Sequence, residues 1–123
     1  MSNPDWAEGY VTDTTYADNF FRELSPAWLN SVAALNGIQP RSLDEAFAYL
    51  ELGCGFGTSA LIHAAAFPQG QFHACDLNHT HIATGKERAI ALGVGNITIH
   101  QAAFQELASR RRGGPFAKSL PST

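Results

Sequence analysis

Cysteine, positive charge and long apolar runs are all scarce in this sequence of 123 residues. Its two cysteines are too few for a disulfide framework, which favours reduced thiols and a cytoplasmic location. Its apolar runs are too short to cross a bilayer, and the N-terminus lacks the basic start and apolar core of a signal peptide. We therefore expect a cytoplasmic protein with no membrane partner.

The charge balance is slightly acidic, with a formal net charge of −3. It lacks the basic footprint of a nucleic-acid-binding protein, apart from the arginines at 110–112, which are typical of a solvated helix end. Hydrophobic residues make up 45% of the chain and charged residues 15%. This composition predicts one globular domain with no nucleic-acid partner.

The five histidines do not form a recognisable ligand pattern. His79 and His81 stand at the start of a predicted helix, the other three are far apart, and no cysteine or carboxylate completes a regular set. We expect no metal site. Cys54 has no neighbouring cation that would make it a thiolate nucleophile.

The first 46 residues are interpreted as an N-terminal arm and a helical segment. Tyr16, Phe20 and the residues that follow have helical spacing, which predicts a helix over Thr15–Leu24. Ser25 suits an N-cap and Pro26 a first helical position, so a second helix is expected to start there and to end at Gly37.

From residue 47 onward the pattern alternates between strand and helix. This alternation predicts an α/β fold with a Rossmann-like partial parallel sheet of about three strands and crossover helices, spanning residues 47–112. Residues 113–123, rich in glycine and proline, predict an irregular tail. The expected strands are 47–52, 71–77 and 96–102, and the expected helices are 58–67, 78 or 80 to 92, and 104 to about 111.

Three glycines stand at alternate positions directly after the first predicted strand, in "YLELGCGFGTS". Gly53, Gly55 and Gly57 allow the backbone to turn sharply and a ligand to approach it closely. Their spacing departs from the G-x-G-x-x-G fingerprint of dinucleotide-binding loops. An acid, Glu51, also precedes the first glycine, and a carboxylate beside a pyrophosphate is unfavourable. The stretch therefore favours a ligand that carries a cation.

The stretch "LELGCGFGT" resembles the first motif of class I S-adenosylmethionine-dependent methyltransferases. That motif has an acid, a spacer and three glycines at alternate positions, which Glu51, Gly53, Gly55 and Gly57 match. The resemblance implies S-adenosyl-L-methionine as the cofactor. It also implies that the loop wraps the methionine part, with Glu51 steering the amino group, often through water.

A second stretch, "HACDLN", is similar to the family motif that ends the second strand. The resemblance implies that Asp76 binds the ribose hydroxyls and that Leu77 lies against the adenine ring. After the third strand the family often carries an acid for the adenine amino group, where this chain has two alanines. Gln101 or Gln105, or otherwise a backbone group, is expected to take that place.

The N-terminal segment is similar in style to that of a subgroup of bacterial methyltransferases, in which helices lie over the cofactor as a lid. This resemblance makes Tyr10, Tyr16 and Arg22 candidate lid contacts. The alternative is that Tyr16 packs against Phe20.

The resemblance covers roughly residues 9–107, which correspond to the first three of seven strands in the family sheet. We expect the cofactor-binding half without the catalytic and substrate half, in a truncated chain that is inactive alone. The open edge of the strand at 47–52 then predicts a homodimer joined through that edge. The alternative is a non-catalytic interaction module, a remnant of the fold that no longer binds the cofactor.

Overall fold

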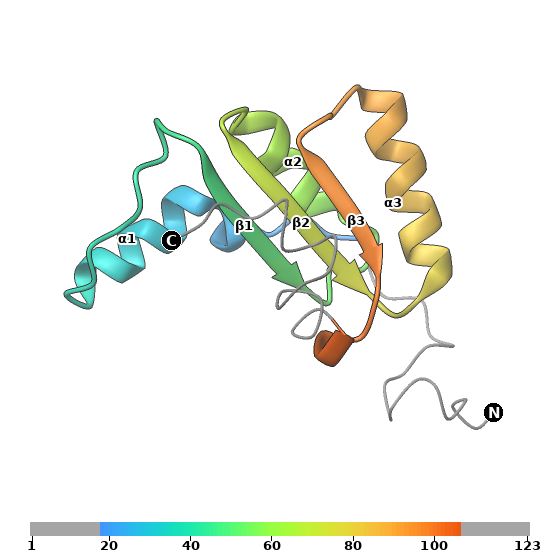
Figure 1. The fold of residues 1–123 in the computed structure, drawn as a ribbon, viewed down its shortest axis with the longest axis horizontal. Helices are drawn as coiled ribbons and strands as arrows, with labels where there is room; N and C mark the ends of the chain where they lie inside the picture. Colours follow the sequence, from blue (N-terminus) through green and yellow to red (C-terminus); the bar gives the residue numbers. More distant parts are fainter. Residues whose placement is uncertain (1–17, 107–123) are drawn as a thin grey trace.

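Three short apolar segments form one parallel sheet (Figure 1). The structure is a computed structural model that describes residues 18–106. Its sheet has the strand order β1-β2-β3, with the strands β1 (Phe47–Leu52), β2 (Gly70–Asp76) and β3 (Ile97–Gln101). Because neighbouring strands are parallel, the chain must cross from the carboxyl end of one strand to the amino end of the next, and a helix forms each of these crossover connections. The predicted α/β class and the three-stranded Rossmann-like sheet are confirmed.

The two crossover helices begin and end close to the predicted residues. They are α2 (Thr58–Ala66) and α3 (His79–Leu92). The Asn78 side chain caps α3 by accepting hydrogen bonds from two backbone N–H groups of its first turn. Gly93 ends α3 in the left-handed conformation, with a φ of 68°. Local capping chemistry therefore sets the bounds of α3.

Both crossover helices lie against one side chain of β3. Cδ1 of Ile99 is 3.6 Å from the place where a Cβ would stand on Gly57, and 3.1 Å from that place on Gly85. A Cβ on Gly85 would also lie 2.7 Å from the carbonyl oxygen of Phe56. The absent side chain at Gly85 thus lets α3 approach the loop between β1 and α2.

Aromatic side chains form the core between β1, β2 and α2. The Phe47 and Phe72 rings meet edge to face with centroids 5.9 Å apart, and the Tyr49 ring lies 4.8 Å from Phe72. The Tyr49 hydroxyl donates a hydrogen bond to the Leu24 carbonyl oxygen at 2.7 Å. Burial, with the nearby charge of Glu51, raises the pKa of Tyr49 to about 12, so the hydroxyl keeps its proton.

The predicted helix over Thr15–Leu24 is wrong in the part that the structure describes. Only one 3₁₀ turn, η2 (Arg22–Leu24), forms there, and the preceding residues from 18 on are not helical. The Phe21 N–H donates to Oγ of Ser59 at 2.8 Å, and its carbonyl oxygen lies 3.1 Å from Nε2 of His63. Contacts with α2 therefore take the place of helical hydrogen bonds. Residues 15–17 lie outside the described residues.

Helix α1 (Pro26–Leu35) begins and ends where the sequence predicts. The Ser25 hydroxyl accepts the Ala27 N–H at 3.2 Å, and Gly37 follows the helix with a φ of 76°. The helix lies beside β1 rather than over the sheet (Figure 1). Its large apolar side chains therefore remain substantially exposed: Trp28, Leu29, Val32 and Leu35.

After β3 the chain becomes helical again at Phe104, and the described residues end at Glu106. The rest of the helix expected to about Arg111, the tail at 113–123 and the arm at 1–14 lie outside them. Within residues 18–106, no helix combines the length and apolar character that a membrane span requires.

Candidate functional site

The loop between β1 and α2, residues 53–57, is the glycine loop. Gly53, Gly55 and Gly57 have φ angles of 71°, 58° and 78°, in a region that residues with a Cβ rarely adopt. This backbone path explains the three glycines at alternate positions. The Cys54 N–H donates to the carbonyl oxygen of Cys75 in β2 at 2.9 Å, which anchors the loop to the sheet.

Asp76, the last residue of β2, holds the glycine loop through its side chain. Its Oδ2 accepts the Gly55 N–H at 3.0 Å, and its Oδ1 accepts the Asn78 N–H at 2.9 Å. A carboxylate offers about four lone-pair sites in total, so both oxygens can still accept from a ligand hydroxyl. The two motifs found in the sequence therefore touch one another.

A pocket of about 850 Å³ opens beside these two motifs. Glu51, Gly53, Gly55, Asp76 and Leu77, all predicted as ligand-binding residues, line it. The pocket walls also include residues from the N-terminal segment, the glycine loop, the start of α2 and the turn after β3: Asp18, Asn19, Phe21, Leu24, Phe56, Thr58, Ser59, Ala103 and Phe104.

Glu51 brings a partly buried carboxylate to the pocket. Within residues 18–106, its buried Oε2 has no hydrogen-bond partner. Burial raises the pKa of Glu51 to about 7. An acceptor withdrawn from water without a donor is costly, and a ligand with an N–H group or a positive charge would satisfy it.

Two predicted ligand residues do not line the pocket. Gly57 is buried at the N-cap of α2. Gln101 donates from Nε2 to the Leu77 carbonyl oxygen at 3.3 Å, so it contacts the backbone of a pocket residue instead. Ala103, one of the two alanines that follow β3, lines the pocket, whereas Gln105 is exposed.

The candidate lid residue Arg22 is also absent from the pocket lining among the described residues. Its guanidinium lies 5.6 Å from the centroid of the Trp28 ring, and its Nε lies 3.5 Å from a carboxylate oxygen of Glu23. Tyr10 and Tyr16 lie outside the described residues. Other residues of the same segment form the pocket wall instead.

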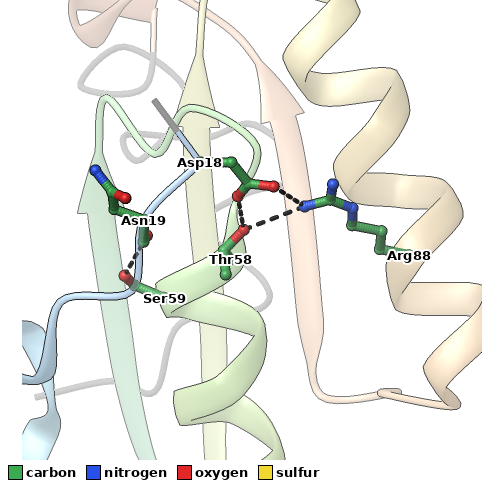
Figure 2. A network of polar contacts seen from close by, with 5 residues as sticks. All are labelled: Asp18, Asn19, Thr58, Ser59 and Arg88. Carbon is green, nitrogen blue, oxygen red and sulfur yellow. Dashed lines mark hydrogen bonds and ion pairs between the residues drawn. The ribbon is translucent and has the colours of Figure 1, made fainter. Parts of the chain in front are cut away.

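Sequence reasoning missed a polar network at this wall (Figure 2). Arg88 of α3 donates to Oδ2 of Asp18 at 2.7 Å and to Oγ1 of Thr58 at 3.2 Å, and the Thr58 hydroxyl bonds to Asp18. The hydrogen bond from Thr58 and then that from Arg88 hold the pKa of Asp18 below its usual value. Beside them, Oγ of Ser59 lies 3.5 Å from the Asn19 carbonyl oxygen. The only sign of this network in the sequence is the pair of hydroxyl residues, Thr58 and Ser59, directly after the third glycine.

Neither metal nor thiol chemistry is evident in residues 18–106. No group of three or more histidine, cysteine, aspartate or glutamate side chains in that range could hold a metal ion. Cys54 and Cys75 are both free thiols. Burial, followed by the charges of Glu51 and Asp76, raises the pKa of the Cys54 thiol, which disfavours a thiolate nucleophile.

Comparison with known proteins identifies a domain family and relatives that this chain resembles. A family model described as "Methyltransferase domain" matches residues 50–116. An uncharacterized protein of Synechocystis sp., sll1526, is 35% identical over 105 residues, which are 85% of this chain and 21% of that protein. The chain therefore spans about a fifth of the length of this curated relative.

Solved structures share the fold. PKMT2 from Rickettsia typhi in complex with AdoHcy is similar with a TM-score of 0.68 and 28% identity, over 75% of this chain and 18% of that chain. A putative sarcosine dimethylglycine methyltransferase from Galdieria sulphuraria has a TM-score of 0.51 and 24% identity, over 66% of this chain and 29% of that chain. This second likeness concerns the fold alone.

Proposed function

This chain belongs to the methyltransferase domain family, and we propose that its pocket binds S-adenosyl-L-methionine as the cofactor-binding part of a methyltransferase. One observation carries the proposal. Glu51 and Asp76, from the ends of adjacent strands, line one pocket around a loop of left-handed glycines. The AdoHcy bound to PKMT2, a similar structure at 28% identity, supports the same choice of ligand.

Each part of the cofactor has a chemically suitable partner in the pocket. Glu51 would take the ammonium group, because its buried oxygen has acceptor capacity to spare. The first turn of α2 offers backbone N–H groups and the positive end of the helix dipole to the carboxylate of the methionine part. Asp76 would accept from the ribose hydroxyls, and Leu77 offers an apolar surface to the adenine. The bound cofactor would supply an activated methyl group.

The charge of the pocket also favours a cationic cofactor over a dinucleotide. Asp18, Glu51 and Asp76 line it, and no lysine or arginine appears among the described lining residues. Arg88 does not line the pocket, and among these three acids it forms an ion pair only with Asp18. The remaining negative charge would attract a sulfonium ion and repel a pyrophosphate.

Calorimetric titration of the chain with S-adenosylmethionine, AdoHcy and NAD⁺ tests the proposal. We expect the first two to bind and NAD⁺ not to bind. Asp76→Ala should weaken AdoHcy binding by about 1.5–3 kcal/mol, the range for hydrogen bonds to a charged group. Asp44→Ala, which removes an exposed acid that does not line the pocket, is the control. A folded wild-type chain that binds neither methionine derivative would favour the alternative, a non-catalytic interaction module.

We also propose that the chain forms a homodimer through the outer edge of β1. Within residues 18–106, β1 pairs with β2 alone, and the side chains Leu50 and Leu52 are 43% and 50% exposed. Pairing two copies edge to edge would complete backbone hydrogen bonds and bury part of each leucine side chain. Light scattering at micromolar concentration should give twice the chain mass of 13.2 kDa. A stable monomer would contradict this assembly.

A further inference from the structure

The guanidinium of Arg88 on α3 contacts two walls of the pocket, the N-terminal segment and the start of α2 (Figure 2). It donates to Asp18 of the N-terminal segment at 2.7 Å and to Thr58, the first residue of α2, at 3.2 Å. It also lies 5.5 Å from the ring centroid of Phe56 in the glycine loop, within cation–π range. One side chain of α3 therefore joins the N-terminal segment to the junction of the glycine loop and α2, which lies about 40 positions further along the chain.

Residues 18–21, which we call the strap, cross the start of α2 as one wall of the pocket. The strap is held at two places. At one, the Phe21 backbone contacts Ser59 and His63 of α2, both of which are buried. At the other, the Asp18 carboxylate meets Arg88 and Thr58.

The Asp18 end is the more easily opened of the two. The side chains of Arg88 and Asp18 are 41% and 36% exposed, so water and salt weaken their attraction. The Phe21 end uses buried partners that are screened far less. Opening should therefore begin at Asp18, and once that end is free the Phe21 contacts with α2 should open more often.

We propose that Arg88 is a positioning residue for cofactor binding: it latches the strap across the pocket, and a bound cofactor leaves after the Arg88–Asp18 contact opens. Arg88 does not itself line the pocket, so it acts through the three residues that it holds. The identity of the ligand rests on the proposed function, whereas the latch itself rests on the contacts of Arg88.

Two measurements on Arg88→Ala test the latch. The first is amide hydrogen exchange in the chain without ligand, read at the Phe21 amide that donates to Ser59. The second is the dissociation rate of AdoHcy. We expect both rates to rise by about 3- to 10-fold, the scale of losing one half-exposed ion pair with its hydrogen bonds. Lys86→Ala removes an exposed cation from the same helix and should match wild type.

Salt and a conservative replacement separate a latch from general support of the fold. Raising sodium chloride from low to molar concentration should speed exchange at Phe21 in wild type and have little effect in Arg88→Ala, because the variant has no ion pair to screen. Arg88→Lys keeps the charge beside Asp18, so it should recover most of the protection. A purely structural role for Arg88 would show neither behaviour.

Each contrary outcome has a distinct meaning. Unchanged exchange at Phe21 in Arg88→Ala would overturn the latch, and so would faster exchange spread equally over the sheet and α3. Faster exchange at Phe21 with an unchanged AdoHcy dissociation rate would overturn its role in ligand release. A wild-type chain that does not bind AdoHcy would refute the proposed function, while the exchange data would still decide whether Arg88 latches the strap.

Discussion

The carboxylate of Asp76 accepts a hydrogen bond from the backbone N–H of Gly55 at 3.0 Å, across 21 positions of sequence. This bond ties the glycine loop to the end of β2. A ligand hydroxyl that binds Asp76 would approach a carboxylate whose orientation the loop has already fixed. Recognition at Asp76 and the conformation of the loop are therefore coupled, and changes at either residue should affect both.

Glu51 should make cofactor binding depend on pH. Its pKa is raised to about 7 by burial, so the carboxylate that would attract a cation is mostly neutral at pH 6 and mostly charged at pH 8. We expect the affinity for S-adenosylmethionine to rise across this interval in wild type. The rise should be absent in Glu51→Gln, as measured by calorimetry at several pH values. An equal rise in both proteins would assign the effect to another group.

The same group predicts how stability changes with pH. A carboxyl whose pKa is about 7 in the folded state, against an ordinary value of 4.5, keeps its proton to higher pH when folded, so stability falls as pH rises from 4.5 to about 7. Glu51→Gln should remove this fall and gain about 1–3 kcal/mol at pH 8 relative to wild type. Urea unfolding at pH 5 and pH 8 measures it. Asp18 has a lowered pKa, so the stability that its charged form contributes is lost only at more acidic pH. It therefore does not affect the comparison between pH 5 and pH 8.

Valine at Gly55 should remove ligand binding while the chain still folds. A Cβ there would meet no heavy atom within 4 Å, but Gly55 lines the pocket and has a φ of 58°. Gly37→Val is the matched control, since Gly37 has a φ of 76°, similar open space and no place in the lining. Both variants should lose about 1–3 kcal/mol of stability from backbone strain. Only Gly55→Val should lose AdoHcy binding in calorimetry, and equal binding by the two would place the ligand elsewhere.

Alanine at Gly85 should destabilise the protein even though alanine favours helices. The new Cβ would stand 2.7 Å from the Phe56 carbonyl oxygen, a backbone atom that cannot move freely. We expect a net loss of about 1–3 kcal/mol in the free energy of unfolding, because overpacking outweighs the gain in helix propensity. Gly95→Ala, where a Cβ would meet nothing within 4 Å, should change stability little. A Gly85→Ala protein as stable as wild type would show that α3 can shift without cost.

Removing the Tyr49 hydroxyl should loosen the N-terminal segment. Tyr49→Phe retains the ring beside Phe72 but removes the donor to the Leu24 carbonyl oxygen. The expected loss is about 0.5–1.5 kcal/mol, typical of one intramolecular hydrogen bond. Chemical denaturation gives the loss, and limited proteolysis shows whether cleavage increases ahead of α1. An unchanged stability would mean that water replaces the hydroxyl at no cost.

The elements of the sheet could be predicted because their signals are local. The apolar run at 47–52 reads as a strand without reference to any other part of the chain, and β1 has those bounds. Asn78 and Gly93 mark the ends of α3 through their own capping chemistry. Such features depend on a few neighbouring residues, so one sequence is sufficient to find them.

The strap could not be predicted because its contacts are distant in sequence. Tyr16, Phe20 and Leu24 have helical spacing, which predicts a helix. Instead the Phe21 backbone contacts α2, and its partner Ser59 is 38 positions away in the sequence. Arg88 lies 70 positions from Asp18, and no periodicity relates them. The pocket lining was therefore predicted where motifs identify it, at Glu51 and Asp76, and missed where only the folded chain brings residues together.

The sheet order has a consequence for synthesis on the ribosome. Each strand pairs with the strand made just before it, so β1, β2 and β3 can assemble in the order in which they leave the exit tunnel. The strap is made first, but its partner Arg88 follows 70 residues later, a delay of roughly 4–14 s at typical elongation rates. During nascent-chain growth β1, the glycine loop and β2 are thus made before Arg88 can hold the strap, whereas β3 and the pocket residues that follow it are made after Arg88.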